Sequence, residues 1–412
     1  MLDEELKSIF QKIDDSKNEM IGFLSDIIKI PALSPEFDGD GEEEKVGLIQ
    51  RYLEEFGFRE FERYDAPDNR VSSGKRPNLI AWLRGKSHEK RLLIITHTDV
   101  VPPGDASQWM TDPYRVMENE EKLYGRGVED NGQSITSSIF AAKALTDLDI
   151  KPAYDVGLIF VADEEIDNEK GIKYLINKDI FRNEDMILVP DHGTSDGRLI
   201  DIAEKSILWV KISTKGKQCH ASMPDSGNNA LRAAMKFGVM VDELLHKKFN
   251  LEDKMFDHPI STFEPTKTEP NVSNVNTIPG NDVFFMDCRI LPQYKTNDVI
   301  SEMKNVAKVI EKETGTNINI DYILNDPAAP STSIDSVIVK KLMKVVNLIN
   351  NNRPFAGGIG GGTCAAIFRH AGHPAVAWET VENNAHAPNE YIRIINMLND
   401  CKVFAALYLD EY

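Results

Sequence analysis

The sequence predicts an α/β fold in which a mainly parallel central sheet is interrupted by a smaller α+β domain. From residue 6 to about 190, helix patterns alternate with short apolar strand patterns, which is typical of a layered domain with a parallel sheet. Between about 201 and 325 the strand patterns lengthen and only two helix patterns remain, and the alternation then resumes. The 412 residues exceed the roughly 250–300 at which single cores stop growing, so two domains are expected.

The first part of the chain supplies most of the parallel sheet and its helices. Helix patterns lie near 6–29, 42–56, 131–147 and 169–177, and strand patterns lie at Leu79–Leu83, Leu92–Thr96, Val156–Ala162 and Met186–Val189. Polar segments directly follow three of these strands, at Thr96–Asp99, Asp163–Glu165 and Pro190–His192. Because ligands gather at the carboxyl ends of the strands in such sheets, we expect these segments to meet at one edge.

The middle of the chain forms the smaller domain. Its strand patterns are Ile207–Thr214, Val272–Ile278, Val283–Leu291 and Ile318–Ile323, and its helix patterns are 228–248 and 297–314. A four-stranded sheet with two helices on one face fits this order. The α/β pattern resumes with a helix at 334–350, the glycine cluster Gly357–Gly362, a strand at Ala375–Trp378 and a helix after Pro388. We therefore predict a catalytic domain formed by residues 1–200 and 326–412, and an inserted domain formed by residues 201–325.

The composition argues against several kinds of partner. Lys and Arg number 47 against 66 Asp and Glu, and the net charge of −19 repels nucleic acid phosphates and anionic membrane surfaces. No apolar run approaches the length of a membrane span, and the charged N-terminal pattern lacks the apolar core of a signal peptide. The four cysteines form no CxxC pair, which suits a reducing compartment. We therefore expect a cytoplasmic protein that binds neither nucleic acid nor membrane.

Imidazole and carboxylate groups stand where the predicted strands end. His97 and Asp99 lie two residues apart, and such a carboxylate can accept the second N–H of the imidazole and raise its basicity as a metal ligand. Asp130 follows paired glycines just ahead of a helix pattern. Taken alone, Asp130 would be a helix N-cap.

Three consecutive acids, Asp163, Glu164 and Glu165, follow an apolar strand, where their repulsion is costly unless cations or protons compensate. One such carboxylate can bind a metal while its neighbour remains free as a base. Asp191, after the next strand, and His386 would complete a set of imidazole and carboxylate ligands. This mixture suits zinc, with cobalt or manganese as alternatives.

Seven segments together resemble the M20 metallopeptidase family, which includes desuccinylases, deacetylases, aminoacylases, carboxypeptidases and dipeptidases. They follow the family's order over almost the whole chain: HTDVVP at 97–102, GRGVEDNG at 125–132, DEE at 163–165, PD at 190–191, GKQCHASMP at 216–224, NTIPG at 276–280 and HAPNE at 386–390. The resemblance implies a zinc-peptidase-like catalytic domain and a ferredoxin-like lid domain through which two chains form a homodimer. It also implies an enzyme that uses two divalent metal ions to hydrolyse C–N amide bonds.

The same resemblance assigns roles to individual residues. It implies that His97, Asp130 and Asp191 bind one metal and that Asp130, Glu165 and His386 bind the other, so that Asp130 bridges them. Glu164 would take a proton from the attacking water and deliver it to the leaving nitrogen, while Asp99 orients His97. His220 would reach in from the lid, often across a dimer interface, to hold the substrate oxyanion.

Further positions match family residues that contact substrate, namely Asn276, Arg289, Gly361, Gly362 and Thr363. An arginine suits a terminal carboxylate because its guanidinium can bind both oxygens. Each assignment has a simpler alternative: a surface or capping role for His220, an interdomain hydrogen bond for Asn276 and Arg289, and a tight chain crossing for the glycine cluster.

Two other functions compete with this interpretation. Gly193–Gly197 fits G-x-S-x-G, which would make Ser195 the nucleophile of a serine hydrolase, but that motif requires a following helix and Leu199–Thr214 has a strand pattern. An inactive binding protein would lack Glu164 or a metal ligand, and every expected position is filled.

The substrate is predicted only as a class. We expect a small, carboxylate-bearing N-acyl amino acid, as for desuccinylases and deacetylases. Dipeptidase or aminopeptidase action on short peptides is the alternative, because an aspartate at position 191 resembles the dipeptidase and tripeptidase branches, whereas a glutamate resembles the deacylases.

Overall fold

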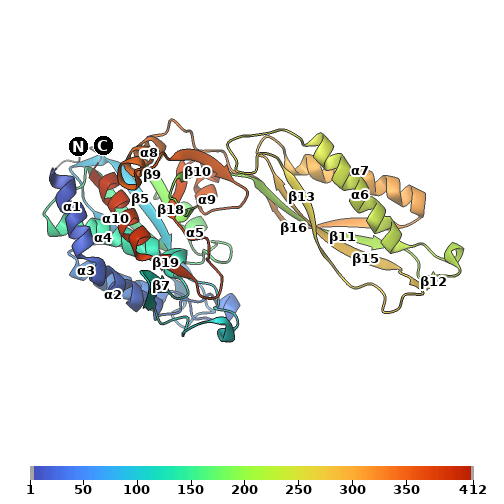
Figure 1. Ribbon diagram of the computed structural model, residues 1–412, viewed down its shortest axis with the longest axis horizontal. Coiled ribbons are helices and arrows are strands. Elements are labelled where there is room, and N and C mark those ends of the chain that lie inside the picture. Colours follow the sequence, from blue (N-terminus) through green and yellow to red (C-terminus); the bar gives the residue numbers. More distant parts are fainter. Residues whose placement is uncertain (1–3, 410–412) are drawn as a thin grey trace. The chain divides into compact units, whose positions relative to one another are not determined.

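The computed structural model describes residues 4–409, which divide into two compact units (Figure 1). Unit 1 contains residues 4–202, 331–356 and 363–409, and unit 2 contains residues 203–330 and 357–362. Unit 2 is therefore inserted between two parts of unit 1. Within residues 4–409, none of the helices has the length and apolar character that crossing a membrane requires.

Unit 1 is built around an eight-stranded sheet with the order β1-β4-β8-β5-β9-β18-β10-β17. In that order the strands are Glu60–Arg63, Leu79–Leu83, Tyr154–Val161, Ser87–His97, Met186–Thr194, Ala375–Thr380, Leu199–Glu204 and Phe355–Ile359. The four neighbours β8, β5, β9 and β18 are parallel, whereas β1 on β4, β4 on β8 and β10 on β18 are antiparallel. The predicted mainly parallel central sheet is confirmed. Every residue of β8 is buried, as expected of a strand with helices on both faces.

Helices cover both faces of this sheet. They are α1 (Glu4–Asp15), α2 (Lys17–Ile28), α3 (Glu43–Glu55), α4 (Gln133–Asp147), α5 (Ile172–Ile176), α8 (Val337–Asn350), α9 (Ala365–His370) and α10 (Ile394–Leu409). Helices α4, α8 and α10 pack on one face, with α1 and α2 outside α4, while α5 and α9 contribute to the apolar core on the other face. The predicted helix 6–29 is two helices separated at Ser16, and the predicted helix 169–177 is shortened to α5, because Gly171 has non-helical backbone angles.

Short elements brace the loops of unit 1. Strands β2 (Ala66–Pro67) and β3 (Lys75–Arg76) form one small sheet, and β19 (Tyr391–Arg393), β7 (Lys122–Tyr124) and β6 (Met117–Asn119) form another. Single turns of 3₁₀-helix lie at Pro35–Phe37 and Ala106–Gln108, and a turn of π-helix lies at Val128–Gly132. These short strands were not predicted, because two or three residues carry no detectable alternation.

Unit 2 has a ferredoxin-like βαββαβ order, as predicted. Its elements are β11 (Ser206–Lys215), α6 (Ala230–Lys248), β13 (Thr262–Thr268), β15 (Asn281–Ile290), α7 (Thr296–Thr314) and β16 (Asn317–Asp326). The sheet order is β13-β15-β11-β16 and all neighbours are antiparallel. A small ladder joins β12 (Cys219–His220) to β14 (Thr277–Ile278), and a 3₁₀ turn lies at Pro224–Ser226.

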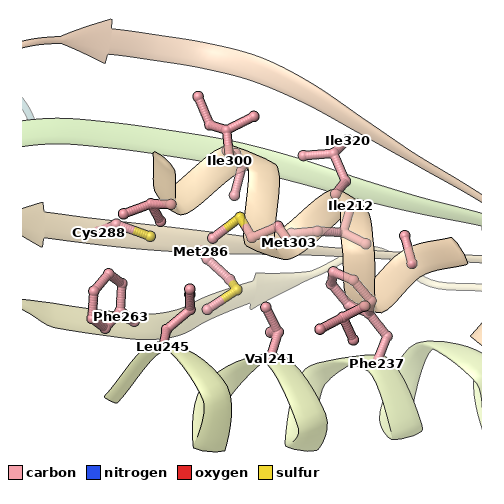
Figure 2. Close-up of a cluster of buried hydrophobic side chains, with 14 of the residues drawn as sticks. Ile212, Phe237, Val241, Leu245, Phe263, Met286, Cys288, Ile300, Met303 and Ile320 are labelled. Atoms are coloured by element: carbon pink, nitrogen blue, oxygen red, sulfur yellow. The ribbon is translucent and has the colours of Figure 1, made fainter. Parts of the chain in front are cut away.

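The core of unit 2 lies between this sheet and its two helices (Figure 2). Along β15 burial alternates strictly, so that Met286 and Cys288 point into the core with Phe237 and Val241 of α6 and Met303 of α7. This is the pattern of a sheet with one covered face.

One strand prediction in unit 2 is wrong. The predicted strand Val272–Ile278 survives only as β14, and the fourth strand of the sheet is β13, which was not predicted. β13 carries Pro265 and several polar residues and is exposed over most of its length. Such a composition is tolerated because β13 lies at the sheet edge, where one side needs no partner.

Candidate metal centre

The carboxyl ends of four neighbouring strands of unit 1 supply a cluster of acids and histidines. His97 is the last residue of β5, Asp163–Glu165 follow β8, and Asp191 lies near the end of β9. His386 lies in the loop after β18. Because β8, β5, β9 and β18 are parallel neighbours, their carboxyl ends meet at one edge of the sheet.

A first triad consists of His97, Asp130 and Asp191. Nε2 of His97 lies 2.6 Å from Oδ1 of Asp130 and 3.3 Å from Oδ1 of Asp191. Nδ1 of His97 lies 3.1 Å from the backbone oxygen of Asp99, which can only accept, so in the neutral ring Nδ1 carries the proton and Nε2 keeps its lone pair. Burial opposes protonation of His97, but Asp130 and Asp191 raise its pKa well above the ordinary value.

A second triad shares Asp130 with the first. Nε2 of His386 lies 3.0 Å from Oδ2 of Asp130 and 3.0 Å from Oε2 of Glu165. Hydrogen bonds to Asp130 and Glu165 raise the pKa of His386 to about 10. Burial would raise the pKa of Asp130, but the two histidines hold it below the ordinary value. Asp130 therefore presents one carboxylate oxygen to each histidine, which is the arrangement of a bridging ligand.

The chemistry of these side chains fits two divalent cations. In each triad the donor atoms lie within 4.8 Å of one another. Each histidine directs Nε2 at carboxylate oxygens, an arrangement that is stable only if a proton or a cation lies between them. Burial raises the pKa of both Glu165 and Asp191, although contacts with His386 and His97 act in the opposite direction. Imidazole nitrogen with carboxylate oxygen is a ligand set that zinc accepts.

Glu164 lies beside these triads without belonging to either. Burial, and then the charge of Asp191, raises the pKa of its carboxyl well above the ordinary value. Its Oε1 accepts a hydrogen bond from Sγ of Cys364 at 2.7 Å. Nothing in the sequence singled out Cys364, which follows the glycine cluster after Thr363.

Asp99 contacts both His97 and the segment Glu164–Glu165. Its carboxylate oxygens accept hydrogen bonds from the backbone N–H groups of Glu164 and Glu165, each at 3.1 Å. The carboxylate is 3.5 Å from Nδ1 of His97, farther than the backbone oxygen of Asp99 itself. The Asp99 side chain thus holds the acid loop, and its main chain orients His97.

Glu129 anchors the loop that carries His386. Its carboxylate accepts hydrogen bonds from the backbone N–H groups of Glu382 and, at 2.8 Å, Asn384. Asp130 follows directly in the chain, and the helix N-cap alternative for Asp130 is wrong, because α4 begins at Gln133 with Gly132 at the N-cap.

Glu390, just after His386 in the chain, holds the loop that carries Asp130. Its carboxylate accepts hydrogen bonds from the backbone N–H groups of Gly127, Glu129 and Asp130 at 2.8–3.1 Å, and from the guanidinium of Arg126. Both Glu390 and Arg126 are almost fully buried. The loops bearing Asp130 and His386 are therefore fastened by one carboxylate from each side, and β7 pairs with β19 beside them.

His220 and Asn276 lie together in unit 2. His220 pairs with Thr277 across the β12–β14 ladder, and Ala221 N–H donates to the backbone oxygen of Asn276. The backbone N–H of Ser222 donates to Nδ1 of His220 at 3.2 Å, so the neutral ring carries its proton on Nε2. His220 is exposed, which leaves that N–H able to donate to a bound group.

Arg289 and the glycine cluster also lie in unit 2. The guanidinium of Arg289 forms two hydrogen bonds with the carboxylate of Asp287 and one, at 2.9 Å, with the backbone oxygen of Gly360. Part of the cluster continues β17, and a Cβ on Gly358 would lie 2.5 Å from the ring of Phe256, so close chain packing requires glycine there. Gly361 and Gly362 close the unit 2 segment, and Thr363 begins the return to unit 1.

Ser195 lacks the setting of a nucleophile. It is exposed in the turn between β9 and β10, and a strand follows it where the serine hydrolase motif requires a helix.

Comparison with known proteins identifies the family of sequences that this chain matches. A model described as peptidase family M20/M25/M40 matches residues 93–410. Proteins named uncharacterized metallohydrolase in Methanococcus maripaludis and in Methanocaldococcus jannaschii are each 38% identical, with 95% of this chain and 98% of each relative covered. A succinyl-diaminopimelate desuccinylase of Alkalilimnicola ehrlichii is 22% identical over 80% of this chain and 85% of its own length.

Solved structures share the fold along nearly the whole chain. Aminopeptidase PepT from Bacillus cereus has a TM-score of 0.75 at 18% identity, covering 95% of this chain and 98% of its own. Human carnosine dipeptidase 1 has a TM-score of 0.72 at 17% identity, covering 98% of both chains. A Bacillus subtilis protein described as a dinuclear metal-binding peptidase from the M20 family has a TM-score of 0.66 at 17% identity, covering 96% and 98%.

Proposed function

The chain belongs to peptidase family M20/M25/M40, and from this membership we propose that it hydrolyses the C–N amide bond of a small, carboxylate-bearing N-acyl amino acid. It is a metal-dependent hydrolase. The observation that carries the proposal is the pair of histidine and carboxylate triads that share Asp130 beside the half-buried carboxyl of Glu164. A desuccinylase among the relatives supports the N-acyl amino acid class.

Two divalent metal ions are part of this proposal. His97, Asp130 and Asp191 would hold one and Asp130, Glu165 and His386 the other. Bound there, two divalent ions would polarise the scissile carbonyl, lower the pKa of the attacking water and neutralise developing negative charge. Zn²⁺ is the first choice for these ligands, and Co²⁺ or Mn²⁺ the alternatives. The Bacillus subtilis relative described as dinuclear supports the count of two.

Glu164 would be the general base. It would accept a proton from the attacking water and then deliver that proton to the leaving nitrogen. A base works best when its pKa approaches the working pH, and burial raises the pKa of Glu164 in that direction. The two hydrogen bonds from the Glu164 and Glu165 backbone to Asp99 would keep the base in place.

His220 would donate its Nε2–H to the substrate oxyanion, from the same chain or from a second copy. Asn276, Arg289, Gly361, Gly362 and Thr363 would contact the rest of the substrate, and Arg289 would share its guanidinium between Asp287 and a substrate carboxylate. His220→Ala is expected to lower kcat at saturating substrate roughly 10²–10³-fold. His246→Ala, which removes another exposed histidine of unit 2, is the matched control. An unchanged kcat in His220→Ala would remove His220 from the mechanism.

We also propose a homodimer formed through unit 2 and located in the cytoplasm. Met235 and Val239 of α6 are each more than 60% exposed, and they line a groove of about 540 Å³ beside the edge strand β13. A second copy could cover this apolar face and extend the sheet. Sedimentation of the purified protein tests the dimer, and a monomer of full activity would contradict it. All four cysteines are free, which supports a reducing compartment.

Short peptides are the second candidate substrate. Asp191 stands where the sequence resemblance favours dipeptidases and tripeptidases, and solved structures with this fold include a dipeptidase and an aminopeptidase. One panel of N-succinyl and N-acetyl amino acids, dipeptides and tripeptides separates the two candidates. Metal content near two ions per chain, with cleavage that chelation abolishes and Zn²⁺ restores, would support the mechanism. Cleavage that survives complete metal removal would overturn it.

A further inference from the structure

The thiol of Cys364 lies against the carboxylate of Glu164, although the two residues are far apart in the chain. Sγ donates to Oε1 at 2.7 Å, and Cys364 is only 4% exposed. Nδ2 of Asn168 donates to Sγ at 3.3 Å and to the backbone oxygen of Glu164 at 3.4 Å. Asn168, Cys364 and Glu164 therefore form a buried hydrogen-bonded chain inside unit 1 that ends on the carboxylate of Glu164.

Glu164 needs such an anchor because it belongs to neither of the two triads that share Asp130, so the proposed metal ions would not fix its side chain. That anchor is the hydrogen bond that the Cys364 thiol donates to the Glu164 carboxylate. Without it, the Glu164 side chain would lose a contact that fixes its orientation.

A thiol suits this position better than a stronger donor would. Arginine or lysine would hold the carboxylate through a charge-assisted bond, but the positive charge would stabilise the ionised form and weaken the base. A thiol is a weak, neutral donor, so it can fix one oxygen at little cost in basicity.

A nucleophilic role for Cys364 does not fit its surroundings. Burial, and then the charge of Glu164, raises the pKa of the thiol well above the ordinary value, which disfavours the reactive thiolate. The protonated thiol keeps the hydrogen that it donates to Glu164.

We propose that Cys364 is a positioning residue for Glu164, whose Oε1 it holds so that Oε2 is available for proton transfer. The inference rests on the proposed function, because the position of Glu164 matters only if Glu164 is the base. It extends that function by a residue that no family motif of the sequence contains.

Kinetics of three variants test the proposal. Cys364→Ala should lower kcat roughly ten- to a hundredfold, part of what a general base contributes, with KM and metal content unchanged. Cys364→Ser keeps a donor and should recover most of that loss. Cys401→Ala removes another fully buried thiol of unit 1 and should leave kcat unchanged. The proposal is overturned if Cys364→Ala keeps full kcat, if it loses metal, or if Cys364→Ser is as impaired as Cys364→Ala.

A double-mutant cycle separates this proposal from the proposed function. In a Glu164→Gln background, Cys364→Ala should cause no further loss of kcat, because the two residues act as one unit. Wild-type activity in Glu164→Gln alone would refute Glu164 as base, and with it the proposed mechanism. A strong loss in Glu164→Gln followed by a full additional loss from Cys364→Ala would refute only the role of Cys364.

Infrared spectroscopy of the S–H stretch provides a readout that needs no substrate. The band of Cys364 is identified as the one missing in Cys364→Ser. In Glu164→Gln this band should move to higher wavenumber, because a neutral amide oxygen is a weaker acceptor than a carboxylate. An unmoved band would show that the thiol does not donate to Glu164 and would overturn the proposal.

Discussion

The two units use their sheets in different ways. In unit 2 only one face of an antiparallel sheet is covered, and the core contains apolar side chains from alternate strand positions and two amphipathic helices (Figure 2). In unit 1 the parallel strands are covered on both faces, and charged groups such as Arg76, Glu42, Arg126 and Glu390 are buried around the strand ends. Both units therefore have apolar cores, but unit 1 also contains buried charges that must be compensated.

The largest expected effect comes from removing the carboxylate that the two triads share. Asp130→Ala should abolish binding of both metals and lower kcat at least about a thousandfold, because in the proposed mechanism the ions and the base would act on the same water. Metal analysis and steady-state kinetics measure this. Glu169→Gln removes an exposed acid of unit 1 that forms an ion pair with Lys173 and should have no effect. An Asp130→Ala protein that keeps two metals would show that compensation of charge at this edge does not depend on Asp130.

A substitution in the apolar core of unit 2 should reduce stability without affecting the metals. Phe237 of α6 is fully buried and packs against Phe284, so Phe237→Ala should destabilise unit 2 by about 3–5 kcal/mol. Hydrogen exchange should show faster opening in unit 2, while the metal content of unit 1 stays the same. Phe237→Leu, which keeps most of the volume, should cost less than about 1.5 kcal/mol. Loss of metal from Phe237→Ala would mean that the units are not independent in stability.

The same contrast explains how much of the fold the sequence predicts. Long elements with a clear period, such as β8, β15, α6 and α7, were predicted within a few residues, because burial on one or both faces leaves a pattern. The edge strand β13 was missed, since an exposed edge imposes no alternation and tolerates Pro265. The short strands β7 and β19 pair with each other, and their own sequences carry no strand pattern that could have predicted them.

Some parts of the candidate site could be predicted from the sequence and others could not. His97, Asp163–Glu165 and Asp191 stand at strand ends, so a parallel sheet was enough to predict that they converge. The contacts of Cys364, Glu129 and Glu390 could not be predicted, because each joins segments that only the tertiary fold brings together. The Asp99 carboxylate was expected beside His97 and lies 3.5 Å from its Nδ1, whereas its hydrogen bonds from the backbone N–H groups of Glu164 and Glu165 were not predicted.

A buried acid away from the metal centre should make the stability of unit 1 depend on pH. Asp400 is fully buried, accepts hydrogen bonds from Thr380 and Gln133, and burial raises its pKa to about 7. In the unfolded chain an aspartate has a pKa of about 3.9. Between about pH 4 and 7 the unfolded state loses this proton first, so the folded state becomes relatively less stable as pH rises, by at most about 4 kcal/mol.

Asp400→Asn should remove that dependence. The variant should be more stable than the wild type at pH 8 and nearly equal to it at pH 4, as measured by denaturant unfolding. An equal pH dependence in both proteins would mean that the Thr380 and Gln133 hydrogen bonds keep Asp400 ionised in the fold.

The smallest effect is expected from Glu129, which contacts the loop of a proposed ligand and not a metal. Glu129 binds no metal in the proposed site, but its carboxylate holds the backbone of the loop that presents His386. Glu129→Gln keeps the shape but replaces one acceptor oxygen by an NH₂ group, which cannot accept either backbone N–H. Loss of a group that orients a ligand typically costs roughly 10–100-fold in metal affinity. Chelator competition should therefore show weaker binding of one of the two ions, the one that His386 would hold.

Glu118→Gln, an exposed acid of unit 1, is the control. If both ions kept their affinity in Glu129→Gln, the contact from Glu390 and the β7–β19 pairing would be sufficient to fix the loop. The negative charges at this edge of the sheet would then be compensated without help from Glu129.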